Sequence, residues 1–418
     1  MKRFSETPAV IFEVIFLGCI FFFAAQKDAT AAQTQQHLPG YFSSAPATDA
    51  GGHELTAARA AASSNLATFT YTVHSSRDGN TYSGSMVGKD PFGADLTTTS
   101  IVTPVVPVIL TTNAVADKIT VAGKSFSVNT KPGVTVFDPT VADHSCLTSP
   151  NDVPLTLMLQ SPIFQSEPFI FGPTAVGTTQ YVDAFQRGNF WQFVGGTDYH
   201  TIVHPRLMPP VRLDLPPSRG LALTPALFGN CGPLAVVDFD VFKQQIFNKL
   251  LAAGGFNSSQ FPVFLFYNTV MSGVSPTNLN KCCILGFHNA VTQQPGADVQ
   301  TYAFIDFDTS GLFGPSIHDT SIAAHEVGEW MDDPFGNNPT PLWGHVGQVG
   351  GCQGNLEVGD PLTGTNIPVV TGANGFKYHL QELAFFSWFY GAPSIAVNGW
   401  FSDNNTFKHD AGPVCTKH

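Results

Sequence analysis

The stretch AAHEVGEWMDDP, Ala323–Pro334, decides the predicted fold class, because it combines helical spacing with side chains that bind metals or move protons. Residues at i and i+4 lie on the same face of a helix, so His325 and Glu329 can bind one ion together. A known zinc-binding helix pattern has a second histidine where this chain has Glu329. The sequence therefore predicts a metal site with one altered ligand.

The helix that carries these residues has recognisable ends. Asp319 or Thr320 can cap its N-terminus, and Pro334 stops it soon after the second aspartate. Apolar residues recur at helical spacing on the face that we expect to be buried: Ile322, Ala323, Val327 and Met331.

The donor chemistry favours zinc without requiring it. Imidazole nitrogen and carboxylate oxygen are both ordinary zinc ligands. A second carboxylate in place of a neutral imidazole makes the ion's surroundings more negative, so harder ions such as Mn²⁺ or Ca²⁺ compete better. Glu326, next to the first ligand, is placed to accept a proton from a metal-activated water. We therefore expect Zn²⁺ or another divalent ion, with Glu326 as general base.

A third protein ligand is expected from the downstream stretch GNLEVGDP, Gly354–Pro361. Glu357 is the first choice and Asp360 the second. Three histidines are weaker candidates: His318, His345 and His379. A second histidine beside His325 and Glu329 would instead give a 2-His-1-carboxylate set of the non-haem iron type.

The remaining sequence predicts a β-rich protein with few helices. Strand-like apolar runs, separated by Gly, Pro, Asn and Asp, occupy residues 67–143 and 261–308. Helical spacing is found in residues 179–194, 238–253 and 379–390.

The N-terminus is typical of an export signal. Lys2 and Arg3 precede the apolar run Ala9–Ala25, and Ala29–Ala31 offers a cleavage site. Because the run is nearly long enough to span a bilayer, a retained membrane anchor is the alternative. We predict a signal peptide at 1–31, a linker or pro-segment at 32–65, a β-rich region at 66–220 and a metal-binding domain at 221–418. After signal cleavage no membrane contact is expected.

Composition narrows the class of partner. Only 12% of the 418 residues are charged, the formal net charge is -12, and no Lys/Arg-rich run could neutralise phosphates. Nucleic acid is therefore excluded as a partner. Six of the seven cysteines follow the predicted signal peptide, which in an exported chain suggests disulfides, with about fifteen possible pairings.

Other candidate sites are weaker. DFDTSG, Asp306–Gly311, begins like an EF-hand loop, but the twelfth position is Ile317, so a capped turn is the better interpretation. His200 and His204 share one face of an extended segment and are interpreted as a structural or surface pair. His288 ends a strand-like run next to the paired cysteines and could lie near the cleft, although packing is its default role. No GxSxG motif supports serine-based hydrolysis.

Two motifs together resemble a known group. His325–Glu329 with Asp333–Pro334, then Trp343 and Asn355–Asp360, resemble the pattern of exordium-like, or phosphate-induced, secreted proteins and their bacterial relatives. That group in turn is similar to a divergent branch of the zincin metallopeptidases. The resemblance covers the last third of the chain, from Cys282 onward, and departs from zincins at the second histidine.

The resemblance implies that His325 and Glu329 are metal ligands, that Glu326 is the catalytic base, and that Glu357 or Asp360 completes the site. It links the chain with growth and the cell wall without fixing a substrate. The expected fold is α+β, with a β-rich N-terminal region followed by a zincin-like domain that has a mixed sheet and an HExxE helix.

Two functional hypotheses follow. The main one is a secreted zinc-dependent metallohydrolase of the metallopeptidase type, acting on a protein or peptide substrate. The alternative is a non-catalytic extracellular protein that binds cell-wall polymers and whose metal site is structural or vestigial.

Overall fold

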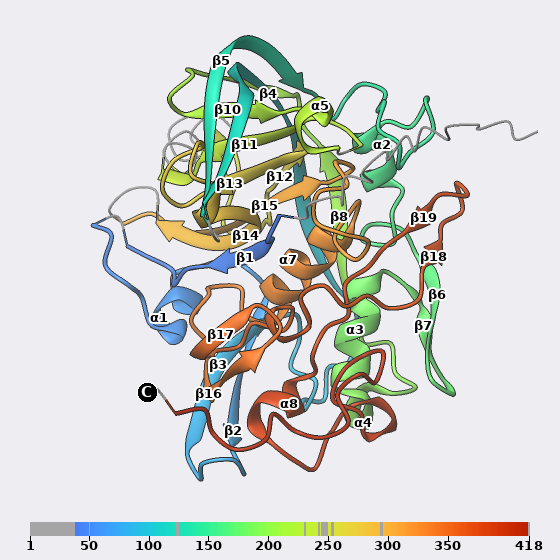
Figure 1. The fold of residues 1–418 in the computed structure, drawn as a ribbon. Coiled ribbons are helices and arrows are strands. Elements are labelled where there is room, and N and C mark those ends of the chain that lie inside the picture. The colour runs from blue at the N-terminus through green and yellow to red at the C-terminus, as the bar shows by residue number, and fades with distance from the viewer. Residues whose placement is uncertain are drawn as a thin grey trace, which may run out of the picture. The chain divides into compact units, whose positions relative to one another are not determined.

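Seven strands close into a ring, which makes a β-barrel (Figure 1). Neighbours around the ring are hydrogen-bonded in the order β4, β10, β11, β13, β14, β15 and β12, and β12 pairs with β4 again. Their bounds are β4 Thr99–Ala122, β10 Gly220–Leu223, β11 Leu234–Asp238, β12 Val263–Tyr267, β13 Thr269–Ser272, β14 Cys282–Thr292 and β15 Val299–Phe307.

The molecule was examined as a computed structural model, which describes residues 38–49, 51–122, 125–229, 231–240, 243, 250–251, 255–292 and 296–416. The predicted signal peptide, residues 1–31, lies outside this range, as does most of the helix predicted at 238–253. None of the helices in the described part is long and apolar enough to cross a membrane.

The predicted fold class, α+β with a zincin-like domain built on a mixed sheet, is wrong, because the chain is mostly β and its sheet closes on itself. The prediction failed because β4 pairs with strands that are distant in the sequence. This strand belongs to the predicted β-rich region, yet Val105 pairs with Val263 and Val115 with Ala222, both in the predicted metal-binding domain. Apolar runs indicate strands, but they do not indicate which distant strands will pair.

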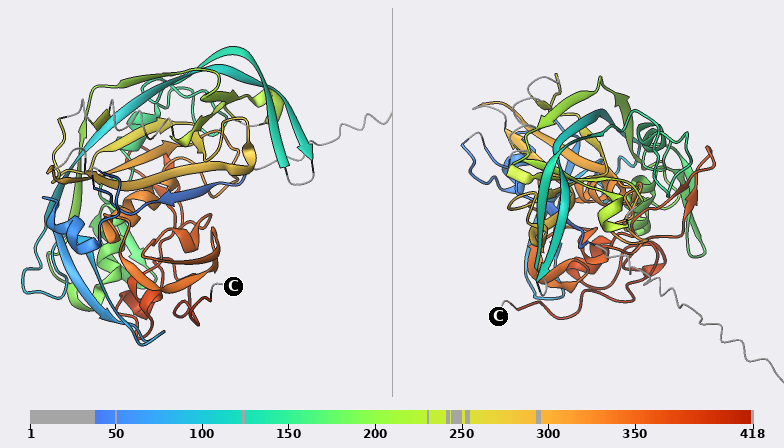
Figure 2. Two further views of the ribbon diagram at one scale, coloured as in Figure 1. Left: turned by 90° about the vertical axis from the view of Figure 1, so that its left-hand side faces the viewer. Right: turned by 45° about the horizontal axis from the view of Figure 1, so that its top comes forward.

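Strand β4 has 24 residues and organises much of the sheet. It forms an antiparallel hairpin with β5, Ser125–Phe137, and pairs in parallel with β8, Thr201–Leu207, and β9, Val211–Leu215. Figure 2 shows the β4–β5 hairpin continuing past the other strands of the ring. The strands predicted in this part of the chain are confirmed.

The ring strands other than β4 are buried on both faces, which explains their largely apolar sequences. In β12, Val263 and Leu265 join one apolar core, whereas Phe264 and Phe266 join another. Side chains alternate between the two faces of a strand, so a strand packed on both faces needs apolar residues at every position.

Outside the ring, four pairs of strands form separate two-stranded sheets. They are β2 Thr68–His74 with β3 Thr81–Val87, β6 Glu167–Phe171 with β7 Thr174–Thr179, β16 Pro339–Val346 with β17 Val349–Asn355, and β18 Val370–Thr371 with β19 Lys377–Tyr378.

The predicted HExxE helix is confirmed as α7, Ser321–Asp332, which packs against β14 and β15 of the ring. Thr320 occupies the N-cap position, and the helix ends before Pro334. The helical spacing at 179–194 corresponds to α3 and α4, whereas the one at 379–390 is helical only in α8. The other helices are α1 Ala57–Ala62, α2 Pro154–Leu159, α3 Tyr181–Asn189, α4 Trp191–Val194, α5 Pro225–Phe228, α8 Phe386–Tyr390, and the short 3-10 turns η2 Leu279–Lys281, η3 Asp360–Leu362 and η4 Val397–Gly399.

Six cysteines form three disulfides, which confirms the prediction of disulfide bonding and selects one connectivity. The pairs are Cys146–Cys231, Cys282–Cys283 and Cys352–Cys415. The last pair joins β17 to the C-terminal segment.

A short strand, β1, Tyr41–Ser44, lies within the region predicted as a linker or pro-segment. It pairs in parallel with β14, with Tyr41 opposite Ile284 and Ser44 opposite His288. This N-terminal segment therefore lies directly beside the strand against which α7 packs.

Candidate metal centre

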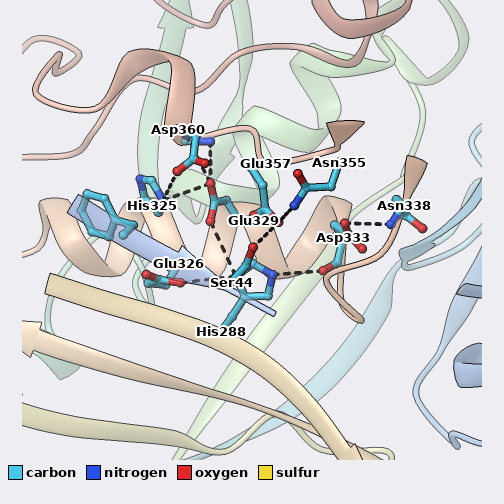
Figure 3. Close-up of polar contacts among 12 residues, drawn as sticks. Ser44, His288, His325, Glu326, Glu329, Asp333, Asn338, Asn355, Glu357 and Asp360 are labelled. Atoms are coloured by element: carbon cyan, nitrogen blue, oxygen red, sulfur yellow. Dashed lines mark hydrogen bonds and ion pairs between the residues drawn. The ribbon is translucent and has the colours of Figure 1, made fainter. Parts of the chain in front are cut away.

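Three separate parts of the chain bring metal-ligating side chains to one buried place (Figure 3). Helix α7 contributes three of them, β14 contributes one, and the loop that follows β17 contributes two. The six residues are His325, Glu326 and Glu329, then His288, then Glu357 and Asp360; all are buried, and Asp360 is the most accessible at 7%.

The first group contains His325, Glu329 and Asp360. The Nε2 atom of His325 is 3.0 Å from Oε1 of Glu329 and 3.6 Å from Oδ1 of Asp360. Two ligands of a tetrahedral zinc ion, each bound at 2.0–2.1 Å, are separated by about 3.3 Å. The two distances from His325 bracket this value, and the three ligand atoms lie within 4.8 Å of one another.

A second group contains His288, Glu329 and Glu357, whose ligand atoms lie within 4.8 Å of one another. The Nδ1 atom of His288 is 3.6 Å from Oε2 of Glu329 and 3.3 Å from Oε2 of Glu326. The two groups therefore share Glu329, which turns one carboxylate oxygen toward each histidine.

Glycines allow the loop and the strand to approach α7 closely. A side chain at Gly359 would collide with the ring of His325, and a Cβ at Gly286 would come within 2.7 Å of Oε1 of Glu326. Because position 359 has no side chain, the backbone amides of Gly359 and Asp360 can both donate to Oε1 of Glu329, at 3.2 Å each.

Neutral donors hold the two loop carboxylates in place. The hydroxyl of Ser44 and the amide of Asn355 donate to Oε1 of Glu357, each at 2.5 Å. Gln353 donates to Oδ2 of Asp360 at 2.8 Å, and Gln348 donates to its Oδ1. Among the described residues, the ion-pair partners of the cluster's carboxylates are histidines rather than lysine or arginine.

The ring of His325 is held from two sides. Phe42 of β1 stacks on it, with ring centroids 3.6 Å apart, and Nε2 of Gln381 is 2.9 Å from its Nδ1. Coordination through Nε2 places the ring proton on Nδ1, so the Gln381 amide would then turn its oxygen toward the ring.

Burial keeps both imidazoles neutral. Burial, together with the nearby His325, lowers the pKa of His288 to about 3, and burial lowers the pKa of His325 to about 4. Neutral imidazole is the form that binds a metal.

Burial has the opposite effect on the carboxyl groups, because it disfavours their charged form. Burial, reinforced by neighbouring carboxylates, raises the pKa of Glu326, Glu329 and Glu357 well above the usual range, and burial raises the pKa of Asp360 to about 6. A divalent cation would reverse these shifts, since it stabilises the ionised form.

Three buried polar atoms of the cluster make no hydrogen bond: Nε2 of His325, Oε1 of Glu326 and Oε2 of Glu357. Buried polar atoms are nearly always satisfied, and an unpaired one needs an explanation. Three such atoms in one cluster fit the donor set of an ion.

The five residues predicted from sequence, His325, Glu326, Glu329, Glu357 and Asp360, are thus brought together. Within the cluster it is Asp360, the second choice, that shares a group with His325, while Glu357 is grouped with His288.

The sequence analysis did not count His288 among the ligands and gave it packing as its default role. The local signal was a single polar residue in an apolar strand. The partners of His288 come from α7, and Glu326 follows His288 by 38 residues in the sequence.

The weaker histidine candidates lie elsewhere. His318 and His379 contact Asp319 in a separate group, and His345 lies beside the Cys352–Cys415 disulfide. In DFDTSG, Ser310 donates through its backbone amide and its hydroxyl to Asp308, as in a capped turn.

The two histidines of β8 differ in their surroundings. Nδ1 of His200 is 2.6 Å from Oδ2 of the buried Asp183, whereas Nε2 of His204 is 3.3 Å from the hydroxyl of Ser100. Both contacts fit the structural or surface role that the sequence suggested.

No family model, curated protein sequence or solved structure matches this chain. The likeness to exordium-like proteins is carried by the two short motifs alone.

Proposed function

We propose that this protein is a secreted hydrolase that depends on a divalent metal ion, with Zn²⁺ as the first candidate and a polypeptide as its substrate. The observation that carries the proposal is the convergence of His325, Glu329 and Asp360 at ligand spacing beside Glu326. The three disulfides fit an oxidising compartment, which supports secretion.

When bound, the ion supplies Lewis acidity, which polarises a carbonyl group and makes water more acidic. Glu326 supplies the base. Its Oε1 has no hydrogen-bond partner, and a nearby cation favours its ionised form over the protonated form that burial alone would favour.

With the ion and Glu326 in place, a peptide bond can be hydrolysed by addition of water. Water adds its oxygen to the carbonyl carbon, and Glu326 accepts one proton from that water. The carbon–nitrogen bond breaks, and Glu326 returns the proton to the leaving nitrogen. The products are a carboxylic acid, which keeps the second proton of the water, and an amine, and Glu326 is ionised again for the next turnover.

The polypeptide substrate is suggested by β1. This extended segment already lies along β14, with Phe42 against His325 and Ser44 bonded to Glu357. Addition of an extended peptide to a strand is a common recognition mode, because backbone hydrogen bonds supply affinity and alternate side chains supply specificity. A substrate strand would take the place of β1.

The burial of the cluster favours a second candidate function. His288, His325 and Glu326 have no accessible surface, so the site is closed while β1 is in place. A closed site of this kind suits a structural ion in a non-catalytic extracellular protein that binds cell-wall polymers.

The two functions are separated by one set of measurements. Purified mature chain is assayed for bound metal and for cleavage of an unstructured protein, together with Glu326→Gln and His325→Ala. Glu54→Gln, an exposed glutamate far along the chain from the cluster, is the matched control. We expect the wild type to contain at least about one equivalent of metal per chain. Turnover by Glu326→Gln should be at least about 100-fold lower than that of the wild type, because the general base is lost.

Stoichiometric metal without turnover that depends on Glu326 would support the structural-ion function. Wild-type protein that binds no divalent ion would contradict both functions.

A further inference from the structure

The tautomer of His288 points to an additional ligand. Its Nε2 atom is 3.2 Å from the backbone carbonyl oxygen of Asp333, so Nε2 carries the proton and donates it. Nδ1 then presents a lone pair to the cluster. It faces Oε2 of Glu326 at 3.3 Å and Oε2 of Glu329 at 3.6 Å.

A lone pair held against two carboxyl oxygens is unfavourable unless a proton or a cation lies between them, and one proton on Glu326 or Glu329 would satisfy only one of the two contacts. The contact is fully buried, so water cannot screen the repulsion. A hydrogen bond from the second ring nitrogen to a carbonyl is also the arrangement that orients metal-ligating histidines.

Glu357 completes this position. Its Oε1 is held by Ser44 and Asn355, which leaves Oε2 buried without a hydrogen bond. The same carboxylate lies in one group with His288 and Glu329. Side chains from β14, α7 and the loop after β17 therefore converge on a point that the first group does not use.

Charge balance also calls for more than one cation. Glu326, Glu329, Glu357 and Asp360 amount to four negative charges when ionised, and histidines are their ion-pair partners in the described chain. One divalent ion compensates two of these charges, so the other two carboxyl groups would have to stay protonated, whereas two ions allow all four to ionise. Uncompensated buried charge is strongly unfavourable.

We propose that the cluster binds two divalent cations, with Glu329 as the bridge between them. Nε2 of His325, Oε1 of Glu329 and Oδ1 of Asp360 hold the first ion. Nδ1 of His288, Oε2 of Glu329 and Oε2 of Glu357 hold the second.

The bridging carboxylate sets the distance between the ions. A carboxylate that gives one oxygen to each ion suits the separation of about 3.5–4 Å found in two-metal hydrolases. Three carboxylates with two imidazoles are donors that Mn²⁺ and Zn²⁺ both accept. The inference rests on the proposed function only for the first ion. The evidence for the second ion comes from His288 and Glu357.

The test counts ions and detects their coupling. The chain is stripped with a chelator, reloaded with Mn²⁺ and desalted. Bound manganese per chain is then measured by elemental analysis, and the spectrum by electron paramagnetic resonance. Wild type is expected to bind two ions with an exchange-coupled spectrum. His288→Ala should bind one uncoupled ion, and the exposed His53→Ala should still bind two.

Glu357→Gln is the companion variant, because it keeps the shape of the side chain and its contacts with Ser44 and Asn355. It is expected to bind one ion even if His288→Ala fails to fold.

A wild type that binds one ion, with the same single ion in Glu357→Gln, would overturn the second site. That result would leave the proposed hydrolase intact if turnover still depends on Glu326 and His325. Wild-type protein without any bound manganese or zinc would overturn both.

Discussion

Phe42 stacks on the imidazole of His325, with ring centroids 3.6 Å apart and ring planes 14° apart. Together with the hydrogen bond from Ser44 to Glu357, this contact makes β1 the cover of the candidate metal centre. Access to the cluster therefore depends on how firmly β1 is held.

Replacing Phe42 by alanine should loosen this cover. Phe42 is buried, so the variant is expected to lose about 3 kcal/mol of unfolding free energy. We also expect a chelator to extract the ion at least tenfold faster, since about 1.4 kcal/mol of local stability corresponds to a tenfold change in opening. Extraction is followed with a coloured chelator. The control is Phe92→Ala, at an exposed aromatic that packs on Phe190 and Phe193. Equal extraction rates in Phe42→Ala and wild type would contradict the role of β1.

Replacing Glu329 by glutamine should change stability in opposite directions with and without metal. In the metal-free chain the substitution removes one of several crowded buried carboxylates, so the melting temperature should rise. In the presence of Zn²⁺ or Mn²⁺ the variant should melt below the wild type, because it loses a charged ligand. Thermal melts with chelator and with excess ion test both signs. A change of the same sign in both conditions would argue against a ligand role.

Asp308 should make the protein less stable as pH rises. Burial raises the pKa of Asp308 to about 7, whereas an unfolded chain has an aspartate pKa of about 3.9. Between these values the unfolded state releases the proton while the folded state keeps it, so unfolding becomes easier as pH increases from about 4 to about 7. Asp308→Asn cannot titrate. Its melting temperature should therefore fall less than that of the wild type between pH 5 and pH 8, and identical falls would refute the assignment.

Removing the Cys352–Cys415 disulfide should weaken both the fold and the site. The bridge closes a loop with a sequence separation of 63, and chain entropy assigns such a loop about 4 kcal/mol. Its strand, β17, also carries Gln353 and Asn355, which hold Asp360 and Glu357. A double Cys→Ser variant should lose stability in denaturant titrations and bind the ion more weakly.

The Cys146–Cys231 bridge, with a separation of 85, offers the matched control. Its removal should cost similar stability but leave ion affinity unchanged in the folded protein. Equal losses of affinity in both variants would mean that the effect on the ion is general rather than local.

Helix α7 could be predicted because its information is local. The one-turn spacing of His325 and Glu329, the polar residues before Ser321 and the stop at Pro334 all lie within a short window. Glu357 and Asp360 were found for a similar reason, because their motif follows the helix at a distance from which a loop or hairpin can return to it.

The barrel could not be predicted in this way. Strand β4 pairs with five partners, among them β12, and nothing in the apolar pattern near Val105 indicates Val263 as its neighbour. His288 was missed for the same physical reason: it becomes a ligand candidate only when β14 packs against α7. Pairing over long distances along the chain is decided by the whole fold rather than by the residues nearby.

Strand β1 and the residues that it contacts beside the cluster are far apart in the sequence. Ser44 is separated from Glu357 by 313 residues, and Phe42 from Gln348 by 306. During synthesis β1 emerges first, and its partners emerge only near the end. Contacts of such high sequence separation form late, because a long loop must close before they can contribute. A nascent chain that has not yet reached Glu357 therefore cannot close the cluster over an ion, so closure of the site reports that β1 has joined the C-terminal part of the chain.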